Sequence, residues 1–139
     1  MAPTDHALLA RVRHSLRVLN RVIETGAKAA GLTVQQQAFL LSLAARGGAH
    51  VPLADLRGDL GMDQATTSEL LRRLGHRGLV TRRTGGDRRA IDLSITRSGR
   101  SALTRSVRAI GREMKLARAQ GDLAALQRNL RAYLAFHAE

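Results

Sequence analysis

The sequence of 139 residues contains no cysteine and no tryptophan, and only three aromatic side chains from phenylalanine and tyrosine. The absence of cysteine excludes disulfide bonds, zinc sites built from thiolates and redox sensing through thiols. With so few aromatic residues, any core has to be built from leucine, valine, isoleucine and alanine, which favours helices packed on helices. The length suits one compact domain, or one compact lobe with helices that a partner covers.

No apolar stretch is long enough to cross a bilayer, and the longest, near residues 38–45, is far too short. The first six residues lack the basic stretch followed by an apolar run that marks a secretory signal. We therefore expect a soluble, cytoplasmic protein. The five histidines show no metal-ligand spacing, such as a pair three or four residues apart, so we expect no metal site and no cofactor.

Positive charge is abundant, because 23 lysines and arginines stand against 11 acidic residues and give a formal net charge of +12. A field of this sign attracts polyanions, and nucleic acid is the first candidate. Nearly all of the basic residues are arginine, whose planar guanidinium can bind a phosphate or a guanine edge with two hydrogen bonds. A genome-wide preference for arginine would produce the same excess, so composition alone leaves both explanations open.

A long amphipathic helix is predicted from Leu8 to about Ala30, because apolar residues recur there every three or four positions. Thr33 and Gln36 then have the spacing of a capping box, in which each side chain binds a free backbone N–H of the other's turn. This pair predicts the start of a second helix that runs to about Ala45.

Two short helices joined by a glycine turn are predicted next. Pro52 suits the first turn of a helix through Leu60, since its missing N–H is not needed there. Asp63 can cap the following helix, which ends near Gly75. Beyond Gly78 the apolar period changes from helical to alternating, so residues 80–84 and 91–95 are predicted to form two strands joined by a Gly-Gly turn into a β-hairpin.

Two more helices complete the chain, a long one that Thr96 can cap and a last one after a break at Gly121. The first helix and the last two carry apolar stripes that are too long for a small central lobe to cover. We therefore interpret residues 1–30 and 97–139 as a helical dimerisation region, and residues 31–96 as a DNA-binding lobe. An intramolecular bundle of the terminal helices is the alternative.

Short polar side chains begin the helix that follows Asp63, as they do in the recognition helix of a helix-turn-helix. Gln64 can bind an adenine edge with two hydrogen bonds, and the methyl group of Ala65 can contact a thymine methyl. Thr66 and Ser68 can bind bases or phosphates. A capped and solvated helix start would look much the same, so this turn needs support from its surroundings.

That support comes from arginines. Arg72, Arg73 and Arg77 lie further along the same helix and suit phosphate contacts, which fix register but carry little sequence information. The hairpin tip is surrounded by four more, Arg82, Arg83, Arg88 and Arg89. A cationic tip of this kind can enter a minor groove, whose negative potential attracts arginine. A solvated charged face is the alternative interpretation of the run.

The run from Asp87 to Gly99, DRRAIDLSITRSG, resembles the signature of the MarR family of winged helix-turn-helix transcriptional regulators. That signature has Asp, any residue, Arg, an alternating apolar strand, Leu-Thr and a glycine three residues later. Ile95 replaces the usual leucine. Residues 60–63 and 74–80 also resemble the borders of that family's recognition helix, and the resemblance extends over nearly the whole chain.

The resemblance implies a mainly α fold with a small β-hairpin wing (α+β) and an obligate dimer. Its two recognition helices would enter successive major grooves of a pseudo-palindromic operator. It also implies that Arg89 contacts the minor groove, that Asp87 braces the wing tip and that Arg73 lies near the DNA backbone. Glu69 departs from the family pattern, because a carboxylate there repels phosphate unless it accepts from a cytosine amino group or pairs with Arg73.

Together these features predict a sequence-specific regulator of transcription, which we expect to be a repressor, that binds double-stranded DNA as a homodimer. The resemblance also suggests release of DNA by a small anionic or phenolic effector, for which His14 and Arg17 are candidate ligands; surface or dimer contacts are their alternative role. No phosphate loop, nucleophile elbow or clustered carboxylate pair indicates an enzyme. A sequence-neutral architectural protein that binds duplex DNA is the remaining alternative.

Overall fold

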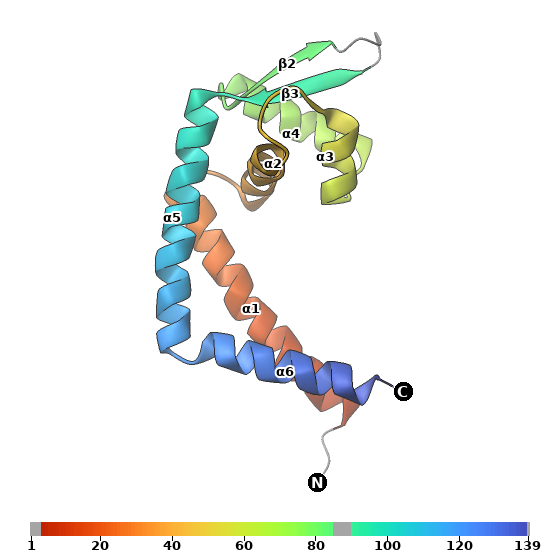
Figure 1. Ribbon diagram of the computed structural model, residues 1–139, viewed down its shortest axis with the longest axis vertical. Helices are drawn as coiled ribbons and strands as arrows, with labels where there is room; N and C mark the ends of the chain where they lie inside the picture. Colours follow the sequence, from red (N-terminus) through yellow and green to blue (C-terminus); the bar gives the residue numbers. More distant parts are fainter. Residues whose placement is uncertain (1–3, 85–89, 139) are drawn as a thin grey trace. The chain divides into compact units, whose positions relative to one another are not determined.

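The computed structural model describes residues 4–84 and 90–138, which form six helices and a three-stranded antiparallel sheet (Figure 1). The mainly α architecture with a small β-hairpin confirms the predicted fold class. In chain order the elements are α1 (Asp5–Ala29), α2 (Val34–Ala45), β1 (Val51–Pro52), α3 (Leu53–Leu60), α4 (Gln64–His76), β2 (Val80–Thr84), β3 (Ile91–Ile95), α5 (Arg97–Ala119) and α6 (Asp122–Phe136).

The chain divides into two compact units. The first, which we call the lobe, is Ala27–Val107 and contains α2, α3, α4, the sheet and the beginning of α5. The second, which we call the terminal unit, combines Met1–Gly26 with Arg108–Glu139 and contains most of α1, the rest of α5 and α6. None of the helices formed by the described residues is long and apolar enough to cross a lipid bilayer.

The core of the lobe is built from aliphatic side chains and a single phenylalanine, as the composition predicts. Its large, fully buried apolar side chains come from α2, α3, α4 and β3: Phe39, Leu40, Leu43, Leu56, Leu74 and Leu93. Burying each such side chain contributes about 1.5–3 kcal/mol relative to leaving it in water. The core therefore fixes which side of α4 faces inward.

Local signals set the ends of α4 and of the helix before it. Gly61, which ends α3, has φ +60, a left-handed conformation that glycine adopts without steric cost. Asp63 is the N-cap of α4, and its Oδ1 accepts a hydrogen bond from the backbone N of Thr66 at 2.7 Å. The predicted cap is thus confirmed, and the two helices are joined by a tight turn.

The sheet has the order β1-β3-β2, and β2 pairs with β3 from Val80↔Ile95 to Thr84↔Ile91. The two predicted strands and their pairing are therefore confirmed, while the predicted Gly-Gly turn between them lies outside the described residues. The prediction for Pro52 is wrong, because this residue pairs with Asp92 in β1 and is the N-cap of α3 rather than part of its first turn. Its φ of −60 and ψ of 133 are extended, and the pairing partner lies forty residues further along the chain.

Thr96 connects the hairpin to α5. Its Oγ1 accepts a hydrogen bond from Gly99 N at 3.0 Å, which confirms the predicted helix cap, and donates one to Gly78 O at 2.6 Å. Its backbone N donates to Leu79 O at 3.1 Å. These bonds hold the base of β2 against the first turn of α5, while β2 itself lies next to α4 (Figure 1).

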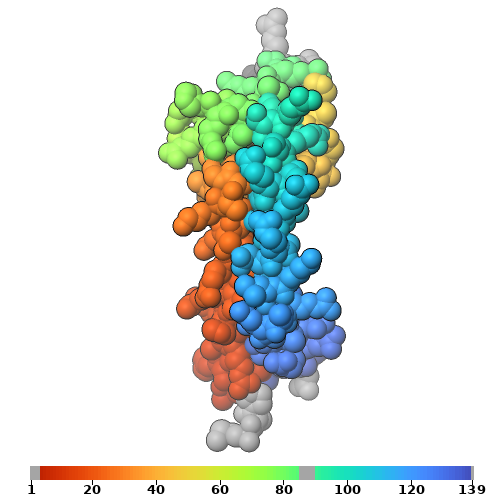
Figure 2. All heavy atoms as spheres, turned by 90° about the vertical axis from the view of Figure 1, so that its left-hand side faces the viewer, coloured from red at the N-terminus to blue at the C-terminus, as the bar shows by residue number. Residues whose placement is uncertain are grey.

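Helix–helix contacts hold the terminal unit together. Asn129 of α6 donates from Nδ2 to Ser15 Oγ of α1 at 2.9 Å. Val22 of α1 and Ala117 of α5 are buried and line one cleft, and these two helices are adjacent in the space-filling view (Figure 2). Gly121, with φ +82, turns the chain from α5 into α6.

Candidate nucleic-acid interface

Helix α4 has a buried face and an exposed face. Thr67, Leu70, Leu71 and Leu74 point into the core of the lobe. The exposed side chains are Gln64, Ala65, Ser68, Glu69, Arg72, Arg73 and His76. The structure thus places three of the predicted base readers on the exposed face, while Thr66 is half-buried beside the capping carboxylate of Asp63.

Arg57 of α3 is a basic residue next to this face that the sequence analysis did not single out. It lines a cleft together with Gln64 and Ser68 of α4 and Ile91 of β3. Its Nε is buried and has no hydrogen-bond partner among the described residues. The hydrogen bond from the backbone of Thr66, and to a smaller degree the charge of Arg57, lowers the pKa of the Asp63 carboxyl.

Glu69 binds the two arginines that follow it on α4. Arg72 donates to both carboxylate oxygens, from Nη2 to Oε1 at 2.8 Å and from Nε to Oε2 at 3.0 Å. Arg73 donates from Nε to Oε1 at 2.8 Å. The hydrogen bonds from Arg72 and then Arg73 lower the pKa of Glu69 to about 2, so this carboxylate is charged at neutral pH. Of the two roles that the sequence leaves open for Glu69, the structure shows the pairing with Arg73, and adds Arg72.

Arg77 has a structural contact within the lobe. Its Nη1 donates to Gln36 Oε1 at 3.0 Å, and the same oxygen accepts from the backbone N of Thr33 at 3.1 Å. The predicted capping box of Thr33 and Gln36 is confirmed, and Arg77 attaches the end of α4 to it. The phosphate contact predicted for Arg77 stays a prediction, and the structure adds a structural role for this side chain, the hydrogen bond to Gln36.

The wing contributes exposed cations from β2. Arg82 and Arg83 are both exposed, and Arg83 Nη2 lies 3.8 Å from Asp92 Oδ2 on β3. The remaining wing candidates, Asp87, Arg88 and Arg89, lie outside the described residues. The minor-groove contact of Arg89 and the bracing role of Asp87 therefore stay predictions.

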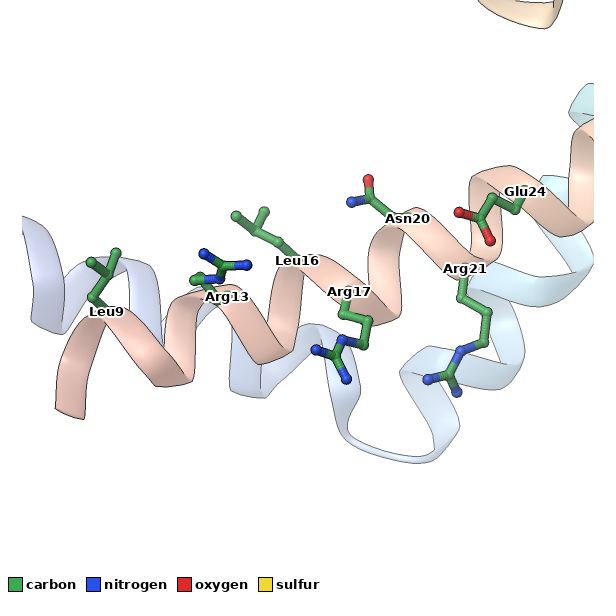
Figure 3. A pocket seen from close by; sticks show the side chains of 7 residues that line it. All are labelled: Leu9, Arg13, Leu16, Arg17, Asn20, Arg21 and Glu24. Atoms are coloured by element: carbon green, nitrogen blue, oxygen red, sulfur yellow. The ribbon is translucent and has the colours of Figure 1, made fainter. Parts of the chain in front are cut away.

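The candidate effector ligands lie on α1. A groove there is lined by the apolar and polar side chains of Leu9, Arg13, Leu16, Arg17, Asn20, Arg21 and Glu24 (Figure 3). Arg17 is in this groove, and its side chain extends to the same side of the helix as that of Arg21. His14 is exposed and is not among the lining residues. Within residues 4–84 and 90–138, no cluster of three or more histidine or acidic side chains could hold a metal ion.

Comparison with solved structures relates this geometry to known regulators. A probable transcriptional regulator from Pseudomonas aeruginosa is 29% identical, with 88% of this chain and 90% of that one covered and a TM-score of 0.66. A MarR family transcription regulator is 25% identical, with 91% of this chain and 85% of that one covered and a TM-score of 0.68. BpsR from Bordetella bronchiseptica, whose DNA binding is regulated by 6-hydroxynicotinic acid, is 25% identical, with 86% and 96% covered and a TM-score of 0.63. No family model and no curated protein matches the chain.

The lobe defines a winged helix protein, because a helix with an exposed polar and basic face is followed directly by a hairpin with exposed arginines. Within that class, the chain is similar to MarR family regulators, and it is a DNA-binding transcriptional regulator. The structural neighbours on which this assignment rests are regulators and not enzymes.

Proposed function

We propose that this regulator is a repressor that reads a pseudo-palindromic operator as a homodimer. The observation that carries the proposal is the asymmetry of α4, whose leucines are buried while Gln64, Ala65 and Ser68 are exposed on its first two turns. These are the positions from which a recognition helix reaches base edges in the major groove. Repression follows from occupancy, because a dimer that covers promoter DNA excludes other proteins from the same stretch.

The terminal unit supports the homodimer, because large apolar side chains are exposed on all three of its helices. They are Leu9 and Leu16 of α1, Leu116 of α5, and Leu130, Leu134 and Phe136 of α6. Leu134 is the most exposed, at 66%. A surface with this many unburied apolar groups is typical of an interface, and a second copy offers the same groups by symmetry.

The experiment that tests operator reading is competition for a fluorescent duplex taken from immediately upstream of the protein's own gene. At physiological salt, unlabelled copies of that duplex should compete about 10³-fold better or more than random DNA of equal length. Equal competition by the two would instead support a sequence-neutral architectural protein.

Light scattering during gel filtration tests the dimer. The wild type should have twice the mass of one chain, whereas Leu134→Glu should shift the population toward the monomer. A monomeric wild type at micromolar concentration would refute the dimer.

We further propose that a small aromatic anion binds the groove on α1 and releases the DNA. Among the described residues, Arg13, Arg17 and Arg21 form no ion pair, so their charges are available to an anion. A hydroxylated aromatic carboxylate of the kind that regulates BpsR has matching chemistry. In a panel of such acids, Arg17→Gln should weaken release of the operator, and Arg11→Gln, outside the groove on the same helix, should not. Equal release from both variants would refute this site.

A further inference from the structure

Glu69 is an acidic side chain on the face of α4 that the proposed function turns toward DNA. Its side chain is 49% exposed, and the side chains of Arg72 and Arg73 are 66% and 61% exposed. The three groups therefore form one solvent-accessible cluster on the helix surface. A carboxylate at this place reduces the positive charge that duplex DNA meets.

The cluster has the bonding pattern of an arginine–phosphate contact. The carboxylate accepts two parallel hydrogen bonds from Arg72 and a third from Arg73. Fork-shaped binding of this kind is how guanidinium groups recognise phosphate. A glutamate that precedes its cationic partner by four residues is also the favoured order for an ion pair on a helix. In the free protein, Nε and Nη2 of Arg72 and Nε of Arg73 are thus already engaged by Glu69.

We propose that Glu69 is an internal competitor of DNA phosphate, which occupies Arg72 and Arg73 and so limits the sequence-independent affinity of α4 for duplex DNA. This inference rests on the proposed function, in which α4 enters the major groove. Phosphates are the same in every duplex, so the competition acts equally on operator and random DNA. In a chain with a net charge of +12, it keeps more of the regulator free from random sequence.

The test replaces Glu69 by glutamine and measures binding to random and upstream duplexes across a salt series. Each additional phosphate contact steepens the dependence of log affinity on log salt by about 0.9. If the wild type and E69Q converge near ~1 M salt, this slope makes E69Q about fivefold tighter at ~0.15 M. We expect this gain on both duplexes. Glu113→Gln on α5 removes the same charge outside the lobe and should leave the slope unchanged.

Two results would overturn the proposal. One is an unchanged or weaker affinity of folded E69Q for random DNA. The other is a gain or loss that depends on the identity of a single base pair, because that pattern belongs to a carboxylate that accepts from a base. Thermal unfolding followed by circular dichroism checks that E69Q is folded.

A second background separates sequestration of the arginines from simple repulsion of DNA by the carboxylate. In a chain that carries Arg72→Gln and Arg73→Gln, sequestration predicts that adding Glu69→Gln no longer steepens the salt slope. A persistent steepening there would contradict it. Because random DNA serves as the probe, the result is independent of operator reading. A wild type that fails to discriminate the upstream duplex from random DNA refutes the proposed function. An unchanged salt slope for E69Q refutes only the role of Glu69.

Discussion

Gly99 is buried in the first turn of α5, where the helix meets the base of the hairpin. A Cβ atom at this position would collide with the carbonyl oxygen of Leu79 and would lie 2.8 Å from Cγ1 of Ile95. The carbonyl cannot easily retreat, because it accepts the backbone hydrogen bond of Thr96 at 3.1 Å. We therefore expect Gly99→Ala to push the wing and α5 apart.

Two effects of opposite sign set the size of this change. Alanine is favoured over glycine inside a helix by up to about 1 kcal/mol. An extra methyl group forced into a packed site costs about 1–3 kcal/mol. At Gly99 we expect a cost at the upper end of this range, because the methyl group would meet the backbone of Leu79 on one side and buried Ile95 on the other. The expected net loss is therefore about 1–2 kcal/mol in the free energy of unfolding.

Gly111 provides the matched control on the same helix, because a Cβ there would meet no atom within 4 Å. Gly111→Ala should stabilise the protein by up to about 1 kcal/mol. Urea denaturation followed by circular dichroism measures both variants, and equal m-values would show that the stability has changed rather than the unfolded state. If Gly99→Ala proved as stable as the wild type or more stable, the close approach of α5 to the hairpin would be refuted.

Further predictions concern the capping box, an ion pair and the contacts of Gln64 and Arg89 with the major and minor grooves of DNA. Thr33→Ala should lower the free energy of unfolding by about 1 kcal/mol, since it removes the N-cap of α2, and an unchanged urea midpoint would contradict this. Hydrogen bonds from Arg46 lower the pKa of Asp59 to about 2. The ion pair therefore stabilises the folded protein fully above the ordinary pKa of 3.8, and this stabilisation is lost as the pH falls through 2. The melting temperatures of the wild type and of Asp59→Asn should converge over that pH range. Gln64→Ala should change the preferred base at one position in a selection from random duplexes, and an unaltered selected sequence would argue against base reading by Gln64. Arg89→Ala should reduce the salt slope of operator binding by about one unit through loss of a phosphate-attracting cation, and an unchanged slope would place Arg89 away from DNA.

Features specified by neighbouring residues could be predicted from the sequence. The cap at Asp63, the capping box of Thr33 with Gln36, and the paired strands around the wing all depend on residues a few positions apart. The exposure of Gln64 and Ser68 could be predicted as well, because the leucines of α4 mark its buried face by their spacing. Short-range periodicity and turn chemistry were sufficient for these features.

Features that depend on distant parts of the chain could not be predicted in this way. β1 has two residues and exists because Val51 and Pro52 meet β3, which no local pattern indicates. The contact of Arg77 with Gln36 joins residues 41 positions apart, so a cation that looks free in the sequence is engaged inside the lobe. The charge of Arg57 next to the first turn of α4 likewise follows from how α3 and α4 pack.

The central claim is that α4 and the wing hold the protein at one register on a duplex. Hydroxyl-radical footprinting of the DNA upstream of the protein's own gene tests this most directly. The account predicts two protected segments whose centres lie about one helical turn, or ~10 base pairs, apart, with minor-groove protection on their flanks. Uniform protection with no fixed register along the fragment, at concentrations that saturate the DNA, would contradict it.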